Sequence, residues 1–230
     1  MSKELSEKEK IESIQKYMVR KPEDFCTFRM LWQFFVTKVW YNMIFTLFYR
    51  YEVEGKENIP KNCNNYIAVG NHLSTLDPVL MATILPNPIA FMAKKELFYH
   101  PILKILLDTL GAFAVDREKV GISTIKTAKS LVKTKKWILG LFPQGTREKA
   151  GKITTVKKGF LGLAKATKCN ILPMGIVGTD KKAKIPFTGK IVVKIGKMIE
   201  LTDNQDEMFD KWIASMQELT GFEYEPQEEE

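Results

Sequence analysis

Beyond Tyr49, short apolar runs alternate with longer segments of helical periodicity, and this alternation constrains the fold more than any other feature of the sequence. Several of the apolar runs are continuous, as expected of strands that helices cover on both faces. The predicted strands are residues 50–54, 66–70, 89–93, 112–116, 137–142, 171–176 and 191–195. The predicted helices are residues 79–84, 101–110, 122–136, 156–167 and 206–219.

A length of 230 residues suits one α/β domain with a small appendage. We therefore predict an α/β fold, a single domain with a central mixed, largely parallel sheet flanked by helices. Residues 50–222 are expected to form this domain and residues 1–49 an N-terminal two-helix motif. Residues 223–230 are expected to be a frayed acidic tail.

Charge is distributed unevenly along the chain. The net charge is +8, but residues 200–230 contain 11 acidic residues and a single basic one, Lys211. The stretch from Lys119 to Lys168 contains 13 basic residues and one acid, Glu148. A region this basic attracts anions, which include nucleic acid, an anionic membrane and phosphorylated substrates. The alternative is an ordinary solvated surface, on which single lysines do little.

Cysteine usage argues against a disulfide framework. Cys26, Cys63 and Cys169 are far apart and form no C-x-x-C pair. A zinc site is therefore not expected either, and the pattern fits a reducing compartment. The N-terminus is polar for more than twenty residues and is unlike a secretory signal.

The first 49 residues predict two helices. Apolar residues recur at helical spacing between residues 5 and 21, and Pro22 then begins a second helix that extends to the end of this region. The second helix is dense in aromatic residues, but Arg29 and Lys38 interrupt every apolar run that would span a membrane. One interpretation is a two-helix motif that lies in a membrane interface, with Lys38 snorkelling. The other is a helical hairpin that packs on the protein's own core.

A strand followed by a polar loop carries the first candidate site. The predicted strand at residues 66–70 delivers His72 to its carboxyl end, where ligands bind in α/β sheets. Asp77 follows five residues later, which lets its carboxylate fold back to the imidazole Nδ1. This contact would fix the tautomer and leave Nε2 free as a base. Alternatively, Asp77 caps the next helix with Pro78 in its first turn, and His72 is an ordinary loop residue.

The second candidate site follows the predicted strand at residues 137–142. Gly145 permits a tight turn there, and Arg147 is exposed just beyond it. The planar guanidinium fork of arginine suits a phosphate group. The alternative is a turn in which Arg147 pairs with Glu148. The segment is not a P-loop, because it lacks a Gly-Lys-Ser/Thr ending.

Five sequence blocks occur in one order along the chain. They are NHLSTLD at residues 71–77, MAKKELF at 92–98, GAFAVDR at 111–117, FPQGTR at 142–147 and ILPMG at 171–175. Together they resemble the motifs of the glycerolipid acyltransferase family, most closely those of its bacterial 1-acylglycerol-3-phosphate acyltransferases. The N-terminal helix pair is similar to the membrane-docking helices of compact bacterial members.

The resemblance implies a role for each matched residue. His72 is implied to be the general base for the acceptor hydroxyl, with Asp77 as its orienting partner. Arg147 is implied to bind the acceptor phosphate. The other implied substrate-binding residues, which add positive charge and shape the pocket, are Lys94, Arg117, Gln144, Gly145 and Thr146. Neither a metal nor a cofactor is implied.

Two positions depart from the family pattern. Gln144 stands where the family's F-P-E-G-T-R motif has glutamate, so it keeps a carbonyl acceptor but loses the negative charge. This departure leaves the acceptor's identity open. Ala114 stands where an aromatic residue is usual, and Phe113 precedes it, which bears on the shape of the pocket.

The implied reaction moves a fatty acyl group from acyl-CoA or acyl-carrier protein to the free hydroxyl of 1-acylglycerol-3-phosphate (lysophosphatidic acid), giving phosphatidic acid. Alternatives are acylation of glycerol-3-phosphate or another lyso-lipid, and a non-catalytic basic membrane-binding module. A lipid hydrolase is disfavoured because no G-x-S-x-G elbow is present, and nucleic-acid binding because no RRM, KH or helix-turn-helix pattern is present. The expected location is an anionic membrane surface, the cytoplasmic face of the cell membrane, as a peripheral or monotopic protein.

Overall fold

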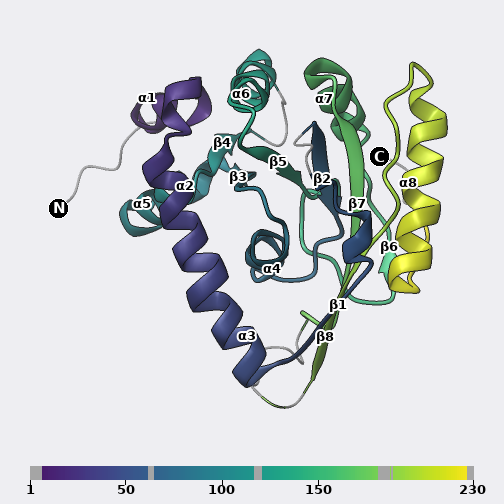
Figure 1. The fold of residues 1–230 in the computed structure, drawn as a ribbon. Helices are drawn as coiled ribbons and strands as arrows, with labels where there is room; N and C mark the ends of the chain where they lie inside the picture. The colour runs from purple at the N-terminus through teal and green to yellow at the C-terminus, as the bar shows by residue number, and fades with distance from the viewer. Residues whose placement is uncertain (1–6, 62–64, 117–120, 181–186, 188, 227–230) are drawn as a thin grey trace.

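A seven-stranded sheet forms the centre of the protein, in strand order β1-β8-β7-β2-β5-β3-β4 (Figure 1). The computed structural model describes residues 7–61, 65–116, 121–180, 187 and 189–226. The strands are β1 (Arg50–Glu54), β2 (Tyr66–Gly70), β3 (Ile89–Lys94), β4 (Phe113–Val115), β5 (Ile138–Leu141), β7 (Asn170–Val177) and β8 (Lys190–Ile195). Neighbouring strands are parallel except for the pair β7 and β8. The predicted mixed, largely parallel sheet is therefore confirmed.

Helices cover both faces of the sheet (Figure 1). They are α1 (Glu7–Met18), α2 (Thr27–Phe34), α3 (Asn42–Phe48), α4 (Asp77–Ile84), α5 (Pro101–Thr109), α6 (Ile122–Lys133), α7 (Gly159–Thr167) and α8 (Gln205–Thr220). Side chains of β2 alternate between two cores, as a strand's period of two requires. Ile67 and Val69 pack with α6, α7 and α8, whereas Tyr66 and Ala68 pack with α4 and Phe45. The helices predicted beyond residue 50 are all present.

One nearly continuous helix crosses the left of Figure 1. It consists of α2, a π-helical segment (Phe35–Tyr41) and α3, and we call residues 27–48 the N-terminal rod. Pro22 begins only a separate 3₁₀ turn before it. Within the described residues, no helix combines the length and the apolar character needed to cross a bilayer.

The inner side of the N-terminal rod packs on the domain through polar as well as apolar side chains. Buried Gln33 donates from Nε2 to the carbonyl of Ile89 at 2.8 Å and accepts from the Ile89 amide, which completes the pairing at the start of β3. Lys38 donates from Nζ to the carbonyls of Thr83 and Leu85, at 2.6 and 2.5 Å, at the end of α4. The interpretation in which Lys38 snorkels in a membrane interface is therefore wrong for this side chain, because its ammonium donates to carbonyls at a helix terminus.

A two-stranded sheet extends the ordered chain into the region predicted to be an acidic tail. β6 (Lys152–Ile153) pairs in parallel with β9 (Glu223–Tyr224). The amide of Glu225 then donates to the carbonyl of Ile153 at 3.0 Å, and buried Phe222 joins the core beneath. Residues 223–225 are thus paired with the domain, and residues 227–230 lie outside the described residues.

Candidate active site

The end of β2 is fixed by a buried asparagine. Asn71, which has no exposed surface, donates from Nδ2 to the carbonyl of Ile176 at 2.8 Å and accepts from the Ile176 amide at 2.7 Å. These two bonds continue the pairing of β2 with β7 by one residue, now through a side chain. His72 therefore leaves the sheet from a defined position at the carboxyl edge.

Asp77 folds back onto the loop that contains His72. Its Oδ2 lies 2.8 Å from His72 Nδ1 and accepts from the amides of Leu73 and Ser74, both at 2.7 Å. Because a carboxylate can only accept, the shared proton belongs to Nδ1 and Nε2 presents a lone pair. The predicted contact between Asp77 and Nδ1 is present. The N-cap position of α4 falls instead on Leu76, so the Asp77 carboxylate serves the loop rather than the helix amides.

The second oxygen of Asp77 has a partner that sequence reasoning missed. Thr179 donates from Oγ1 to Asp77 Oδ1 at 2.6 Å, and both side chains are fully buried. Thr179 follows β7, which is the parallel neighbour of β2. The position of Thr179 in the sequence could have indicated this contact, because polar residues that follow adjacent parallel strands lie at the same edge of the sheet.

The FPQGTR segment forms the turn that sequence analysis predicted. Gly145 has a φ of 71°, in the left-handed region that favours glycine, and its amide donates to the Phe142 carbonyl at 3.0 Å. The ring of Phe142 stacks on the His72 imidazole with centroids 4.4 Å apart. Sequence analysis did not single out Phe142 as a site residue, although it follows directly after β5, the neighbour of β2.

Gln144 lies beneath the His72 loop instead of in an open pocket. Its side chain is 2% exposed, Oε1 accepts from the His72 amide at 2.5 Å, and Nε2 donates to Glu148 Oε2 at 2.6 Å. Glu148 also accepts from Thr154 and Thr155. The structure therefore shows Glu148 bonded to these residues and not to Arg147, and Thr146 and Arg147 are exposed at the surface of this loop.

Lys94 is not brought into contact with His72. Lys94 ends β3, two strands from β2 in the sheet order, and its side chain is 54% exposed with Glu96 at 3.8 Å. Its neighbour Lys95 forms the closer ion pair, at 2.7 Å with Asp116. Arg117 lies outside the described residues.

A small apolar cavity of about 90 Å³ lies beside the site. Its lining includes Phe142, Pro143, Met92 and Leu163, together with Gly145 and Lys157. Apart from Lys157, the side chains that line it are apolar and suit a hydrocarbon. The site thus combines an oriented imidazole, an exposed arginine and an apolar recess.

Comparisons with known proteins agree on one family. A family model described as "Acyltransferase" matches residues 50–177, which include His72, Asp77 and the loop after β5. The chain is 33% identical over 129 residues to the 1-acyl-sn-glycerol-3-phosphate acyltransferase of Borreliella burgdorferi, covering 56% of this chain and 51% of that protein. It is 33% identical over 153 residues to the enzyme of the same name from Bacillus subtilis, covering 66% of this chain and 75% of that protein. The match therefore spans about half the length of the first relative and three quarters of the second.

A solved structure has the same fold. The crystal structure of the 1-acyl-sn-glycerophosphate (LPA) acyltransferase PlsC from Thermotoga maritima superposes with a TM-score of 0.60 at 28% identity. The superposition covers 77% of this chain and 76% of that chain.

Proposed function

The chain belongs to the acyltransferase family, and on that premise we propose that it transfers a fatty acyl group from an acyl thioester to the free hydroxyl of 1-acylglycerol-3-phosphate, giving phosphatidic acid. The observation that carries the proposal is the 2.8 Å contact between His72 Nδ1 and buried Asp77, which leaves Nε2 as the available base. The names of the relatives support the acceptor.

The proposed reaction balances with His72 as the only proton carrier. Nε2 takes the proton of the acceptor hydroxyl while the hydroxyl oxygen attacks the thioester carbonyl and forms the new C–O bond. The tetrahedral intermediate then expels the thiolate as the C–S bond breaks, and the imidazolium returns the proton to sulfur. Asp77 stabilises the imidazolium and holds its orientation throughout.

Substrate binding divides between charged and apolar surfaces in this proposal. Arg147 binds the acceptor phosphate, since its guanidinium is exposed on the loop whose other residues contact His72. Thr146 and Gly145 shape the same loop, and Lys94 and Arg117 add longer-range positive charge. The apolar cavity beside Phe142 receives part of an acyl chain. Acyl-CoA and acyl-carrier protein both present the required thioester, so the donor is either of them.

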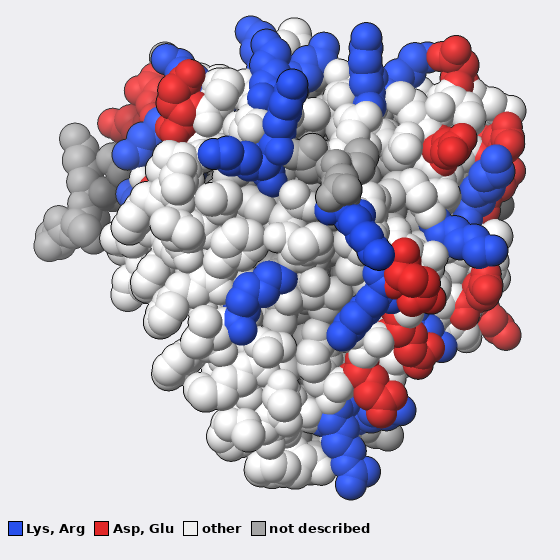
Figure 2. Space-filling model, in the orientation of Figure 1, with Lys and Arg blue, Asp and Glu red and all other residues white. Residues whose placement is uncertain are grey.

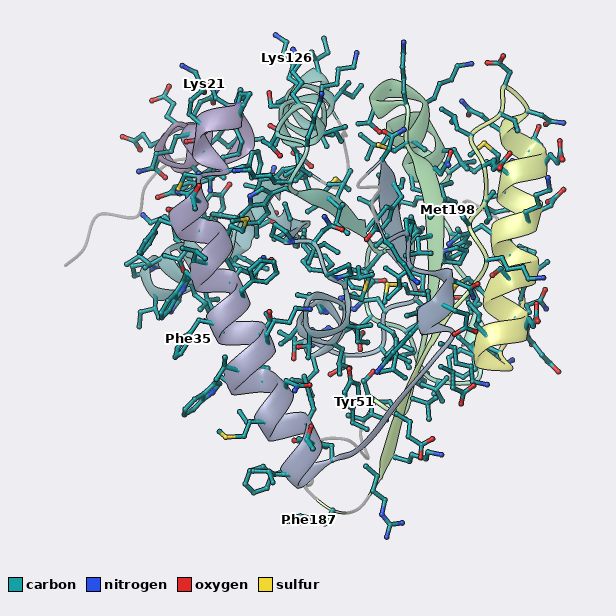
Figure 3. All side chains as sticks on the ribbon, in the orientation of Figure 1. Lys21, Phe35, Tyr51, Lys126, Phe187 and Met198 are labelled. Atoms are coloured by element: carbon teal, nitrogen blue, oxygen red, sulfur yellow. The ribbon has the colours of Figure 1, made fainter. Side chains whose placement is uncertain are left out.

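We also propose that the outer side of the N-terminal rod and α5 docks on a membrane, on its cytoplasmic face. The exposed apolar side chains there, which we call the apolar face, are Phe28, Leu31, Trp32, Phe35, Val39, Trp40, Met43, Leu47, Ile102, Leu103, Ile105 and Leu106. Figure 2 shows this side of the molecule with few charges, and Figure 3 shows Phe35 pointing away from the sheet. A continuous patch of this kind marks an interaction surface, and its aromatic composition suits a lipid interface.

Basic side chains supply the electrostatic part of the proposed membrane contact. Lys126, Lys129 and Lys133 are exposed on α6, and basic side chains gather over this helix in Figure 2. An anionic lipid surface attracts each such lysine within a Debye length.

Release of free thiol from acyl-CoA tests the proposed activity. We expect release that depends on 1-acylglycerol-3-phosphate, with weaker responses to glycerol-3-phosphate and to a lyso-lipid without phosphate. His72→Ala should lower the rate about 10²–10⁴-fold, which is typical for loss of a general base.

His100→Ala is the matched control, because His100 only caps α5 by accepting from the Leu103 amide at 3.4 Å. Turnover of folded His72→Ala at the rate of the unsubstituted protein would contradict the mechanism. A preference for another acceptor would contradict the substrate assignment alone.

A further inference from the structure

Both backbone groups of His72 bond to the loop that follows β5. The His72 amide donates to Gln144 Oε1 at 2.5 Å, and the His72 carbonyl accepts from the Glu148 amide at 2.9 Å. Asp77 fixes the ring of His72, but these two bonds fix its backbone. The residue therefore has two independent sets of restraints, one from its own loop and one from residues 144 and 148.

The bonding of Gln144 requires a neutral amide. One end must accept from the His72 amide and the other must donate to the Glu148 carboxylate, which assigns Oε1 and Nε2 without ambiguity. An ionised glutamate at this position has no hydrogen to donate to the Glu148 carboxylate. It would place two carboxylates at hydrogen-bond distance, where they repel unless they share a proton.

Glu148 is in turn held by the residues that follow β6. Its Oε1 accepts from Thr154 Oγ1 and from the Thr155 amide, both at 2.9 Å, and Oε2 accepts from the Thr154 amide at 3.1 Å. With Gln144, the carboxylate accepts four hydrogen bonds. The negative charge at residue 148 is therefore stabilised where it is, and it orients Gln144.

We propose that Gln144 and Glu148 are a pair of positioning residues that hold the backbone of His72, with the carboxylate of this loop carried at residue 148 and not at residue 144. The significance of the pair for catalysis rests on the proposed function of His72. The pair accounts for glutamine in place of the motif's glutamate at residue 144, since an ionised glutamate there would repel Glu148. Gln144 is then not a residue that touches the acceptor.

The test exchanges the two side chains. Gln144→Glu should lower kcat for acyl transfer at least about tenfold, with the KM for both substrates within about twofold, because the substrate surfaces are unchanged. The exchanged variant Gln144→Glu/Glu148→Gln should recover part of this loss, since residue 148 then supplies the donor to residue 144 but no longer accepts from the Thr154 amide. Gln205→Glu, at an exposed position of α8, makes the same charge change and should leave kinetics unchanged.

Three results would overturn the proposal. They are full activity of Gln144→Glu, a loss confined to the KM of the acceptor, and an exchanged variant no more active than Gln144→Glu. If Gln144→Glu does not fold, recovery of folding in the exchanged variant supports the pair, and failure to recover contradicts it.

Hydrogen exchange of the His72 amide supplies a readout that needs no substrate. This amide should exchange at least about tenfold faster in Gln144→Glu and in Gln144→Met, and return toward its original rate in the exchanged variant. Unchanged exchange would overturn the pair even if the protein is an active acyltransferase. Conversely, altered exchange in a protein without acyl transfer would contradict only the proposed function.

Discussion

The loop around His72 and the apolar face differ in whether their side chains find partners within the protein. Around His72, the polar atoms of Asp77, Gln144 and Glu148 are taken up by hydrogen bonds within the protein. On the apolar face, large hydrophobic groups such as Trp40 remain exposed. The first region is complete as it stands and supports a preorganised site, whereas the second buries its apolar surface only against something else.

The N-terminal rod carries both bonded polar side chains and exposed apolar side chains on one helix. Its inner side carries Gln33 and Lys38, which bond to backbone groups of the domain, together with buried Phe45, and its outer side carries the exposed aromatic residues. A surface helix of a soluble domain has an apolar stripe that faces the core and a polar outer side. The rod differs because its outer side is apolar as well, while both polar and apolar contacts hold its inner side to the domain.

Apart from the loss of His72 itself, the largest effect expected within the site comes from Arg147→Lys. Lysine keeps the charge but loses the bidentate fork, so kcat/KM for 1-acylglycerol-3-phosphate should fall about ten- to a hundredfold. Steady-state kinetics with an acceptor that lacks phosphate should show little change. Equal losses on both acceptors would assign Arg147 to the thioester or to the loop structure.

Removal of aromatic groups from the apolar face tests the other region. Trp32→Ser with Trp40→Ser, at positions 40% and 55% exposed, should lower partitioning onto vesicles that contain anionic lipid by about tenfold. Catalysis of a detergent-dispersed substrate should be retained. Ala214→Ser, at an exposed position of α8 on the side of the molecule opposite the N-terminal rod (Figure 1), serves as the control. Partitioning unaffected by the tryptophan changes would show that the basic surface binds alone.

A smaller effect is expected when Asp77 loses one of its hydrogen-bond donors. Thr179→Val removes the donor to Asp77 Oδ1 and should lower kcat about two- to tenfold with little change in KM. Thr179→Ser retains the hydroxyl and should retain most activity. If the serine and valine variants are equally impaired, packing of the methyl group matters and the hydrogen bond does not.

The smallest effect concerns stability and the junction of the two regions. Burial lowers the pKa of Lys38 from 10.5 to about 8. Below this pH the lysine is charged in the folded and unfolded chains alike, and between about 8 and 10.5 only the unfolded chain keeps the proton. The free energy of unfolding should therefore rise with pH across this window. Urea denaturation should show a shallower rise in Lys38→Met, and an identical slope would place the titration elsewhere.

The sequence predicted those parts of the fold that extended patterns encode. The continuous apolar run at Tyr66–Gly70 indicated a buried strand, and β2 has these bounds. β6 and β9 are two residues each, so neither has enough length to show a period of two. The inward direction of Lys38 was also hidden, because it depends on the carbonyls at the end of α4 and not on the residues beside it.

The contacts of the site also divide into those that the sequence could predict and those that it could not. The contact of His72 with Asp77 was predictable because both residues lie in one short loop. The contacts of Thr179 and of Gln144 were not, since each joins segments brought together by strand order, 102 and 72 residues apart in the chain. The bonds of Glu148 further depend on the backbone path after β6, which no local pattern records.

The position of β1 at the edge of the sheet has a consequence for folding during synthesis. β1 is the first strand in the chain, yet it pairs with β8, where Arg50 is opposite Lys190. At roughly 5–20 residues per second, the ribosome finishes β8 on the order of ten seconds after β1. Until then the N-terminal rod is joined to a strand without its partner. The inner side of the rod, which includes Phe45, is therefore uncovered and open to aggregation until the domain has formed.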